Sequence, residues 1–119
     1  MSKITLFLLT ALLPIMLLTG CSRVSEEDVR SAKQEVQNGA LLIDVRRADE
    51  FAGGHLTGAI NIPVQQLPQQ LASLSTEKYK SAVVYCRSGN RSASAAGILR
   101  KNGWKVIDVA TQQDWNRYN

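Results

Sequence analysis

The stretch that most constrains the fold of this chain is SAVVYCRSGNRSASAAGILR, residues 81–100. A β-branched, apolar run over residues 82–85 predicts a strand, and that run ends at Cys86. A polar loop follows, and then an Ala-rich segment with helical spacing. The pattern predicts a strand, a turn and a helix, with the cysteine at the carboxyl end of the strand, where α/β sheets place their ligands.

The turn after Cys86 also contains two arginines, Arg87 and Arg91. Backbone N–H groups in such a turn and at the start of the following helix favour negative charge at one place. A thiolate is such a charge, so the residues indicate a nucleophilic cysteine rather than an inert buried one. We expect Gly89 to adopt a conformation that other residues resist, and Ser92 to be the N-cap of the helix.

Residues 86–92, CRSGNRS, resemble the active-site loop of a single-domain rhodanese, a sulfurtransferase that carries sulfane sulfur as a cysteine persulfide. Upstream, residues 44–46, DVR, and residues 50–63, EFAGGHLTGAINIP, resemble the first part of the same family's pattern. The resemblance covers roughly residues 26–115 and implies a rhodanese-like α/β fold, with a mainly parallel central sheet of about five strands and helices on both faces.

Strand and helix patterns alternate along the chain and favour the same fold class. We expect helices after an N-cap at Ser25 up to Asn38, and over residues 46–51, 64–74, 93–101 and 112–118. We expect strands over residues 40–45, 59–62, 82–85 and 104–109, with a polar connector over residues 76–80.

The resemblance implies that Cys86 attacks the outer sulfur of a small anionic donor such as thiosulfate and keeps it as a persulfide. A thiol, cyanide or a protein is the expected acceptor, and no cofactor is expected besides the covalent persulfide. The residues expected to bind the donor are those that follow the cysteine: Arg87, Ser88, Gly89, Asn90, Arg91 and Ser92.

Three other polar residues invite a catalytic role, but we interpret them as structural. Asp44 and Arg46 are expected to brace the active-site loop, as the resemblance implies. His55 is the only histidine, and one histidine without clustered ligands makes a poor metal site, so we expect it to form structural hydrogen bonds and expect no metal.

The N-terminus predicts export and lipid anchoring. Residues 4–18 form an apolar run that is too short for a comfortable membrane span. Residues 18–21, LTGC, resemble the bacterial lipobox, which implies a signal peptide over residues 1–20 and lipidation at Cys21. A short tether (residues 21–25) and one domain (residues 26–119) would follow. Because Ser22 is not an aspartate, the resemblance implies the periplasmic face of the outer membrane; the alternative is an anchor helix with an incidental cysteine.

Charge and cysteine content limit the classes of partner and the covalent bonds that we expect for this protein. The net charge of +4 is spread along the chain without interleaved aromatic residues, so no nucleic acid is expected. The sequence has two cysteines. Lipidation of Cys21 would leave Cys86 as the only thiol, unable to form an internal disulfide.

Two other functions stay open besides the sulfurtransferase. The first is a phosphatase-like or arsenate-reductase-like enzyme, although phosphatase loops place five residues between cysteine and arginine and this loop has four, residues 87–90. The second is a membrane-tethered persulfide carrier or binding module. Residues 109–115, VATQQDW, also lack the glycine pair that similar proteins have before the tryptophan. The resemblance therefore does not define the shape of the pocket edge or the identity of the sulfur acceptor.

Overall fold

The computed structural model describes residues 24–74 and 80–118. The signal peptide (residues 1–20), the lipidation site at Cys21, most of the tether and most of the connector at 76–80 lie outside the described residues. Within the described part, no helix combines the length and the apolar character that crossing a bilayer requires.

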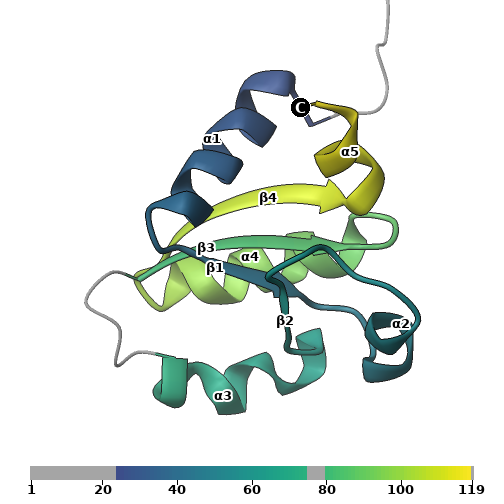
Figure 1. Cartoon of the computed structure of the whole chain (residues 1–119). Coiled ribbons are helices and arrows are strands. Elements are labelled where there is room, and N and C mark those ends of the chain that lie inside the picture. The colour runs from purple at the N-terminus through teal and green to yellow at the C-terminus, as the bar shows by residue number, and fades with distance from the viewer. Residues whose placement is uncertain (1–23, 75–79, 119) are drawn as a thin grey trace, which may run out of the picture.

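Helices and strands alternate as the sequence predicts (Figure 1). The strands are β1 (Leu41–Asp44), β2 (Ile60–Asn61), β3 (Ser81–Cys86) and β4 (Lys105–Thr111). The helices are α1 (Glu26–Gln37), α2 (Ala48–Ala52), α3 (Leu67–Leu74), α4 (Asn90–Lys101) and α5 (Gln112–Arg117), with a 3-10 turn, η1 (Val64–Gln66), before α3. The predicted helix over residues 64–74 is therefore divided between η1 and α3.

The strands form one parallel sheet in the order β2-β1-β3-β4, which confirms the α/β fold class; four strands pair where about five were expected. Leu42 pairs with Val83, and Cys86 pairs with Thr111. Because all strands run the same way, their carboxyl ends share one edge of the sheet. Asp44, Cys86 and Thr111 therefore come together there.

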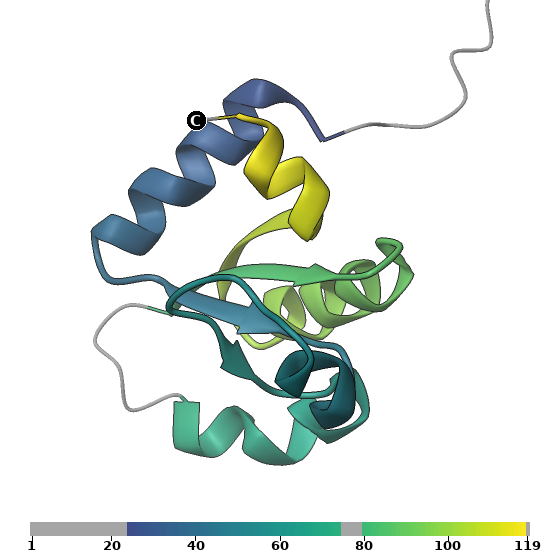
Figure 2. The same ribbon diagram turned by 45° about the vertical axis from the view of Figure 1, so that its right-hand side comes forward.

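The helices cover both faces of the sheet, as expected (Figures 1 and 2). Strand residues alternate between the two faces, so each strand contributes to two apolar clusters. One cluster lies on the side of α3 and α4, and the other on the side of α1 and α5. The first includes Ile43, Val84, Cys86, Leu67 and Leu99, and the second includes Leu42, Val83, Tyr85, Val29 and Trp115.

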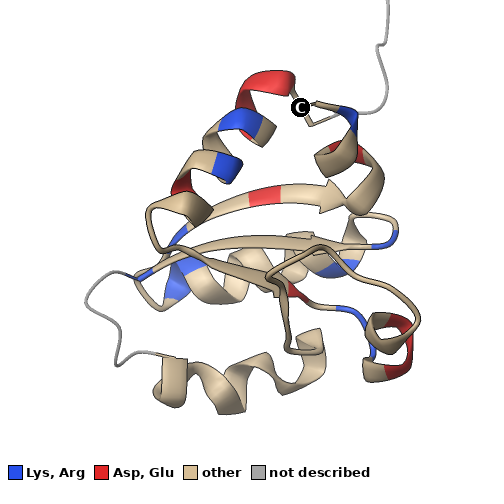
Figure 3. Ribbon diagram, viewed as in Figure 1, with Lys and Arg blue, Asp and Glu red and all other residues tan. Residues whose placement is uncertain are grey.

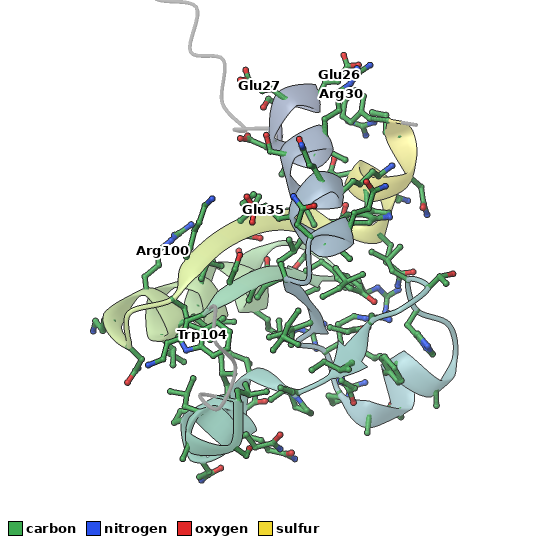
Figure 4. The ribbon with its side chains drawn as sticks, turned by 60° about the vertical axis from the view of Figure 1, so that its left-hand side comes forward. Glu26, Glu27, Arg30, Glu35, Arg100 and Trp104 are labelled. Carbon is green, nitrogen blue, oxygen red and sulfur yellow. The ribbon has the colours of Figure 1, made fainter. Side chains whose placement is uncertain are left out.

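Helix α1 begins at the predicted cap. The Ser25 hydroxyl accepts from the Asp28 N–H at 3.0 Å, and the Asp28 carboxylate accepts from the Ser25 N–H at 3.4 Å, which makes a capping box. Glu26 and Arg30 pair at the exposed start of the helix (Figure 4). Near its other end, the Glu35 carboxylate accepts from Lys105 Nζ at 2.9 Å. Lys105 is the first residue of β4, so this ion pair ties α1 to the amino end of the sheet, opposite to the end that holds Cys86.

Strand β4 contains one extra residue opposite β3. Val84 pairs with Asp108 and Cys86 with Thr111, so Val109 and Ala110 together face a single residue of β3. Ala110 has a φ of 60°, the one left-handed non-glycine residue in the described part of the chain, and its N–H donates to Asp108 Oδ1 at 2.8 Å. The missing glycine pair therefore does not prevent this bulge in β4, because Ala110 adopts the left-handed conformation itself.

We expect Ala110→Gly to raise the free energy of unfolding. Relief of the left-handed strain, about 1–2 kcal/mol, exceeds the extra unfolded-state entropy of glycine, so the net gain is about 0.5–1 kcal/mol. Ala110→Val should lower it by more than about 1 kcal/mol, since a β-branched residue resists positive φ. Urea unfolding of both variants measures the effect.

Ala93→Gly is the matched control, because Ala93 is exposed and lies in a helix. This change should destabilise the protein by about 0.5–1 kcal/mol. If both glycine variants lose stability equally, Ala110 is not strained.

Candidate active site

Cys86 is the last residue of β3 and is almost fully buried, with 1% of its surface exposed. Its side chain lies on the α4 side of the sheet, as the alternation along β3 requires. The sulfur accepts from two backbone N–H groups of the following loop, Gly89 N at 3.0 Å and Ser92 N at 3.4 Å. Both N–H groups point to the same atom, so they can also bind a sulfur that carries negative charge. We call residues 86–92 the Cys86 loop.

The prediction that Ser92 is the N-cap of α4 is wrong. The helix starts at Asn90, and Gly89 is the N-cap, with no side-chain cap of its own. The Ser92 N–H, which a capping side chain would normally bind, donates to the Cys86 sulfur instead. The Ser92 hydroxyl is fully buried and donates to Gly89 O at 3.0 Å, which fastens the loop from inside.

Gly89 has a φ of 96°, in the left-handed region, as the sequence predicts for the sharpest point of the loop. A Cβ added there would lie 3.4 Å from the Cβ of Ala110, the left-handed residue of β4. The loop and the β4 bulge are therefore close neighbours, and the φ of Gly89, not a lack of space, is what resists a side chain at position 89.

Arg91 makes a bidentate ion pair with Glu50 of α2, with Nη1–Oε1 at 2.6 Å and Nη2–Oε2 at 3.1 Å. The hydrogen bonds from Arg91 hold the pKa of Glu50 at about 2, well below its usual value. In return, Glu50 raises the pKa of Arg91, and the nearby Cys86 adds to that rise. The contact ties the Cys86 loop to α2, 41 residues away in the chain.

Arg87 is exposed and lines a pocket of about 230 Å³ that opens onto Cys86. The other residues that line it are Arg46, Thr111, Gln112 and Gln113. We call it the Cys86 pocket. Within the described residues, Arg87 has no ion-pair partner, in contrast to Arg46 and Arg91.

Asp44 and Arg46 pair with each other at the end of β1. Asp44 is fully buried, and it accepts from Arg46 Nη2 at 2.7 Å, from Arg46 Nε at 3.0 Å and from the Arg46 backbone N–H at 2.9 Å. The carboxylate raises the pKa of Arg46. The guanidinium also lies 5.9 Å from the Tyr85 ring centre and donates to Gly54 O at 2.7 Å.

The side-chain amide of Gln112, the first residue of α5, also lies against Arg46. We orient the amide with its oxygen toward the guanidinium, because the nitrogen would there face the donors of Arg46 and have only Gly54 O, at 3.5 Å, as an acceptor. In this orientation it accepts from Arg46 Nη2 at 3.0 Å and from Nη1 at 3.3 Å. Among the described residues, the side-chain hydrogen bonds of the Asp44–Arg46 pair reach the Gly54 turn and α5 but not residues 87–92, so a brace of the Cys86 loop by this pair stays a prediction.

His55 has the structural setting that the sequence suggested. Its ring stacks on Phe51 with centroids 3.6 Å apart, and Nδ1 lies 2.9 Å from Phe51 O. Across the described residues, no group of three histidine, cysteine, aspartate or glutamate side chains is arranged to hold a metal ion.

Two hollows of opposite charge flank the Cys86 loop. The charged side chains of the Cys86 pocket are both arginines, Arg46 and Arg87. The larger hollow, about 640 Å³, is lined by Ser88, Gly89 and Asn90 of the loop, and its charged residues are all aspartates: Asp28, Asp108 and Asp114. Figure 3 shows basic positions in the β3–α4 connection and at the start of α4. An anion is therefore attracted to the hollow that contains the sulfur.

Three site residues received no role in the sequence analysis. Glu50 lies inside the motif at 50–63 but was not paired with Arg91, because the pairing depends on tertiary structure. Tyr85 is buried at the end of β3, where its hydroxyl accepts from Leu56 N at 3.0 Å and burial raises its pKa to about 12. Gln112 belongs to residues 109–115, which lack the glycine pair of similar proteins, and this difference was the only sequence feature that pointed to a role for Gln112.

A profile of the rhodanese-like domain matches residues 28–117. The uncharacterized protein YqhL of Bacillus subtilis is 44% identical over 84 residues, which cover 71% of this chain and 62% of YqhL. The thiosulfate sulfurtransferase PspE of Escherichia coli is 34% identical over 68 residues, covering 57% of this chain and 65% of PspE. The chain thus spans less than two thirds of either relative.

The human single-domain sulfurtransferase TSTD1 has the same fold, with a TM-score of 0.60 and 27% identity over 84% of this chain and 99% of that one. The fold, the match over residues 28–117 and these similarities agree with one another. This chain belongs to the rhodanese-like domain family.

Proposed function

We propose that this protein is a thiosulfate sulfurtransferase of the rhodanese type that works through a persulfide on Cys86. The observation that carries the proposal is the position of the Cys86 sulfur. It accepts hydrogen bonds from two loop N–H groups, and Cys86 lines a pocket whose charged residues are both arginines. Sulfurtransferases among its relatives support the reaction class.

In the first half-reaction, the Cys86 thiolate attacks the outer sulfur of thiosulfate. A new S–S bond forms to Cys86, the S–S bond of the donor breaks, and sulfite leaves with the electron pair. In the second, a nucleophile such as cyanide or a thiolate takes the outer sulfur and restores the Cys86 thiolate. The loop N–H groups can bind the anionic persulfide as they bind the sulfur of the free cysteine.

The role that we assign to each arginine follows from the ion pair that it makes or lacks. Arg91 is committed to Glu50 and holds the Cys86 loop in place. Arg46 is committed to Asp44. Arg87 lines the pocket without an ion-pair partner among the described residues, so we assign it the first contact with the anionic donor.

A lipid on Cys21 would place this site close to a membrane, and we include periplasmic anchoring in the proposal. Val24 lines the hollow beside the Cys86 loop, and Cys21 precedes it by three residues in the sequence. Three residues span at most about 11 Å, so the anchor would hold the loop near the bilayer surface.

Intact mass tests the persulfide directly. In a Cys21→Ser background, where Cys86 is the only thiol, thiosulfate should add the mass of one sulfur atom, and cyanide should remove it. The double variant Cys21→Ser, Cys86→Ser should gain nothing. An unmodified mass from a protein whose Cys86 still reacts with iodoacetamide would refute thiosulfate as the donor.

Arg87→Ala should raise the KM for thiosulfate about three- to tenfold, with little change in kcat, because it removes one solvent-screened charged contact. The difference in KM between Arg87→Ala and the unsubstituted protein should shrink as ionic strength rises. Steady-state kinetics with cyanide as acceptor measure both constants. Lys101→Ala, which removes the same charge from an exposed position at the far end of α4, is the control. A KM for Arg87→Ala within about twofold of the control would contradict the assignment.

Glu50→Gln should destabilise the protein in a pH-dependent way. The folded-state pKa of Glu50 is about 2, against 4.5 ordinarily, so its ion pair stabilises the fold above pH 4.5 and is lost as pH falls toward 2. The difference in unfolding free energy between wild type and Glu50→Gln should therefore be full near pH 7 and shrink below about pH 4.5. Urea unfolding at several pH values measures it, with Glu27→Gln on exposed α1 as the control. A difference that stays constant down to about pH 3 would show that the charge of Glu50 contributes nothing.

A further inference from the structure

We propose that Gln112 determines the anion affinity of the Cys86 pocket by occupying the outward N–H groups of Arg46. Gln112 and Arg46 both line that pocket. The inference deepens the proposed function, since the anion concerned is the sulfur donor, but its main test does not require sulfur transfer.

The hydrogen bonds of Arg46 show which of its N–H groups remain for an anion. Nε binds Asp44, while Nη2 binds Asp44 and Gly54 O. Nη1 has one acceptor within the described residues, the amide oxygen of Gln112 at 3.3 Å. Nη1 is thus the part of the guanidinium that the interior leaves unused, and the Gln112 oxygen accepts from one of its two N–H groups.

The Gln112 oxygen and a donor anion would compete for the same N–H groups. A charged donor such as a guanidinium binds an anionic oxygen more strongly than a neutral amide oxygen. The amide, however, is held in place by the chain, so an anion must displace it in order to bind both N–H groups of Nη1. With Gln112 present, Arg87 is the one cation of the pocket whose side chain has no ion-pair or amide partner among the described residues.

Position 112 can carry this role because it belongs to the segment that lacks the glycine pair. The bulge at Ala110 is followed by residues 111–113, which line the pocket, and Thr111 caps α5 by accepting from Asp114 N at 3.0 Å. Gln112 is therefore the first residue of α5, where its side chain is partly exposed and contributes little to the core. A glycine there would leave Arg46 uncovered.

The test compares two alkylating reagents on Cys86 in the full chain with Cys21→Ser. Iodoacetate is anionic and iodoacetamide is neutral, and in both reactions the Cys86 thiolate displaces iodide. Because the same thiolate attacks both reagents, the ratio of the iodoacetate rate to the iodoacetamide rate reports how the pocket receives an anion. In Gln112→Ala this ratio should rise about threefold or more, because Arg46 Nη1 is freed. In Gln112→Glu the ratio should fall below that of the unsubstituted protein, since a carboxylate would pair with Arg46 and repel anions.

Asn116→Ala is the matched control, an amide removed from the exposed side of α5 one turn further on. The inference is overturned if the ratio for Gln112→Ala stays within about 1.5-fold of Asn116→Ala, or if Gln112→Glu raises it. The KM for thiosulfate should fall in parallel with the rise in the ratio. A changed ratio in a protein that transfers no sulfur from thiosulfate would refute the proposed function and support the role of Gln112.

Discussion

The Asp44 carboxylate is fully buried at the end of β1, and this constraint organises the carboxyl edge of the sheet. A buried carboxylate needs a cation with good geometry, and removing one partner of such a pair costs about 3–5 kcal/mol. Arg46 supplies that cation two residues later in the chain. Its remaining donors then reach Gly54 and Gln112, so one ion pair connects β1, the turn after α2 and the start of α5.

The Cys86 loop is fixed from a different direction, by atoms that also take part in the proposed chemistry. The sulfur binds the Gly89 and Ser92 N–H groups, where a helix of this kind normally has a capping side chain. The loop is thus stabilised by the Cys86 sulfur itself. Arg91 adds a second attachment through Glu50, which explains how a short loop keeps its shape while Arg87 remains exposed.

Much of this fold could be predicted from the sequence, because the signals are local. The apolar runs, the Ser25 cap and the glycine at position 89 each report on a few neighbouring residues, and the structure has the corresponding elements. The motifs resembling rhodanese also identified the family correctly. The contacts that sequence reasoning missed join distant residues: Glu50 with Arg91, and Arg46 with Gln112. The Ser92 cap was predicted wrongly because α4 begins at Asn90, before its Ala-rich pattern, which places Ser92 inside the first turn with its N–H on the Cys86 sulfur.

The two left-handed residues beside the larger hollow, Gly89 and Ala110, show how one departure from the family pattern is accommodated. Gly89 is required by its φ of 96° and not by a lack of space, because a Cβ there would meet the Ala110 methyl group at 3.4 Å, an ordinary van der Waals distance. Ala110 adopts a φ of 60° although it has a Cβ, so the cost of the missing glycine pair falls on the bulge in β4 and not on the Cys86 loop. The extra residue of that bulge lets β4 pair with β3 up to Cys86 and then continue directly into α5 at Gln112.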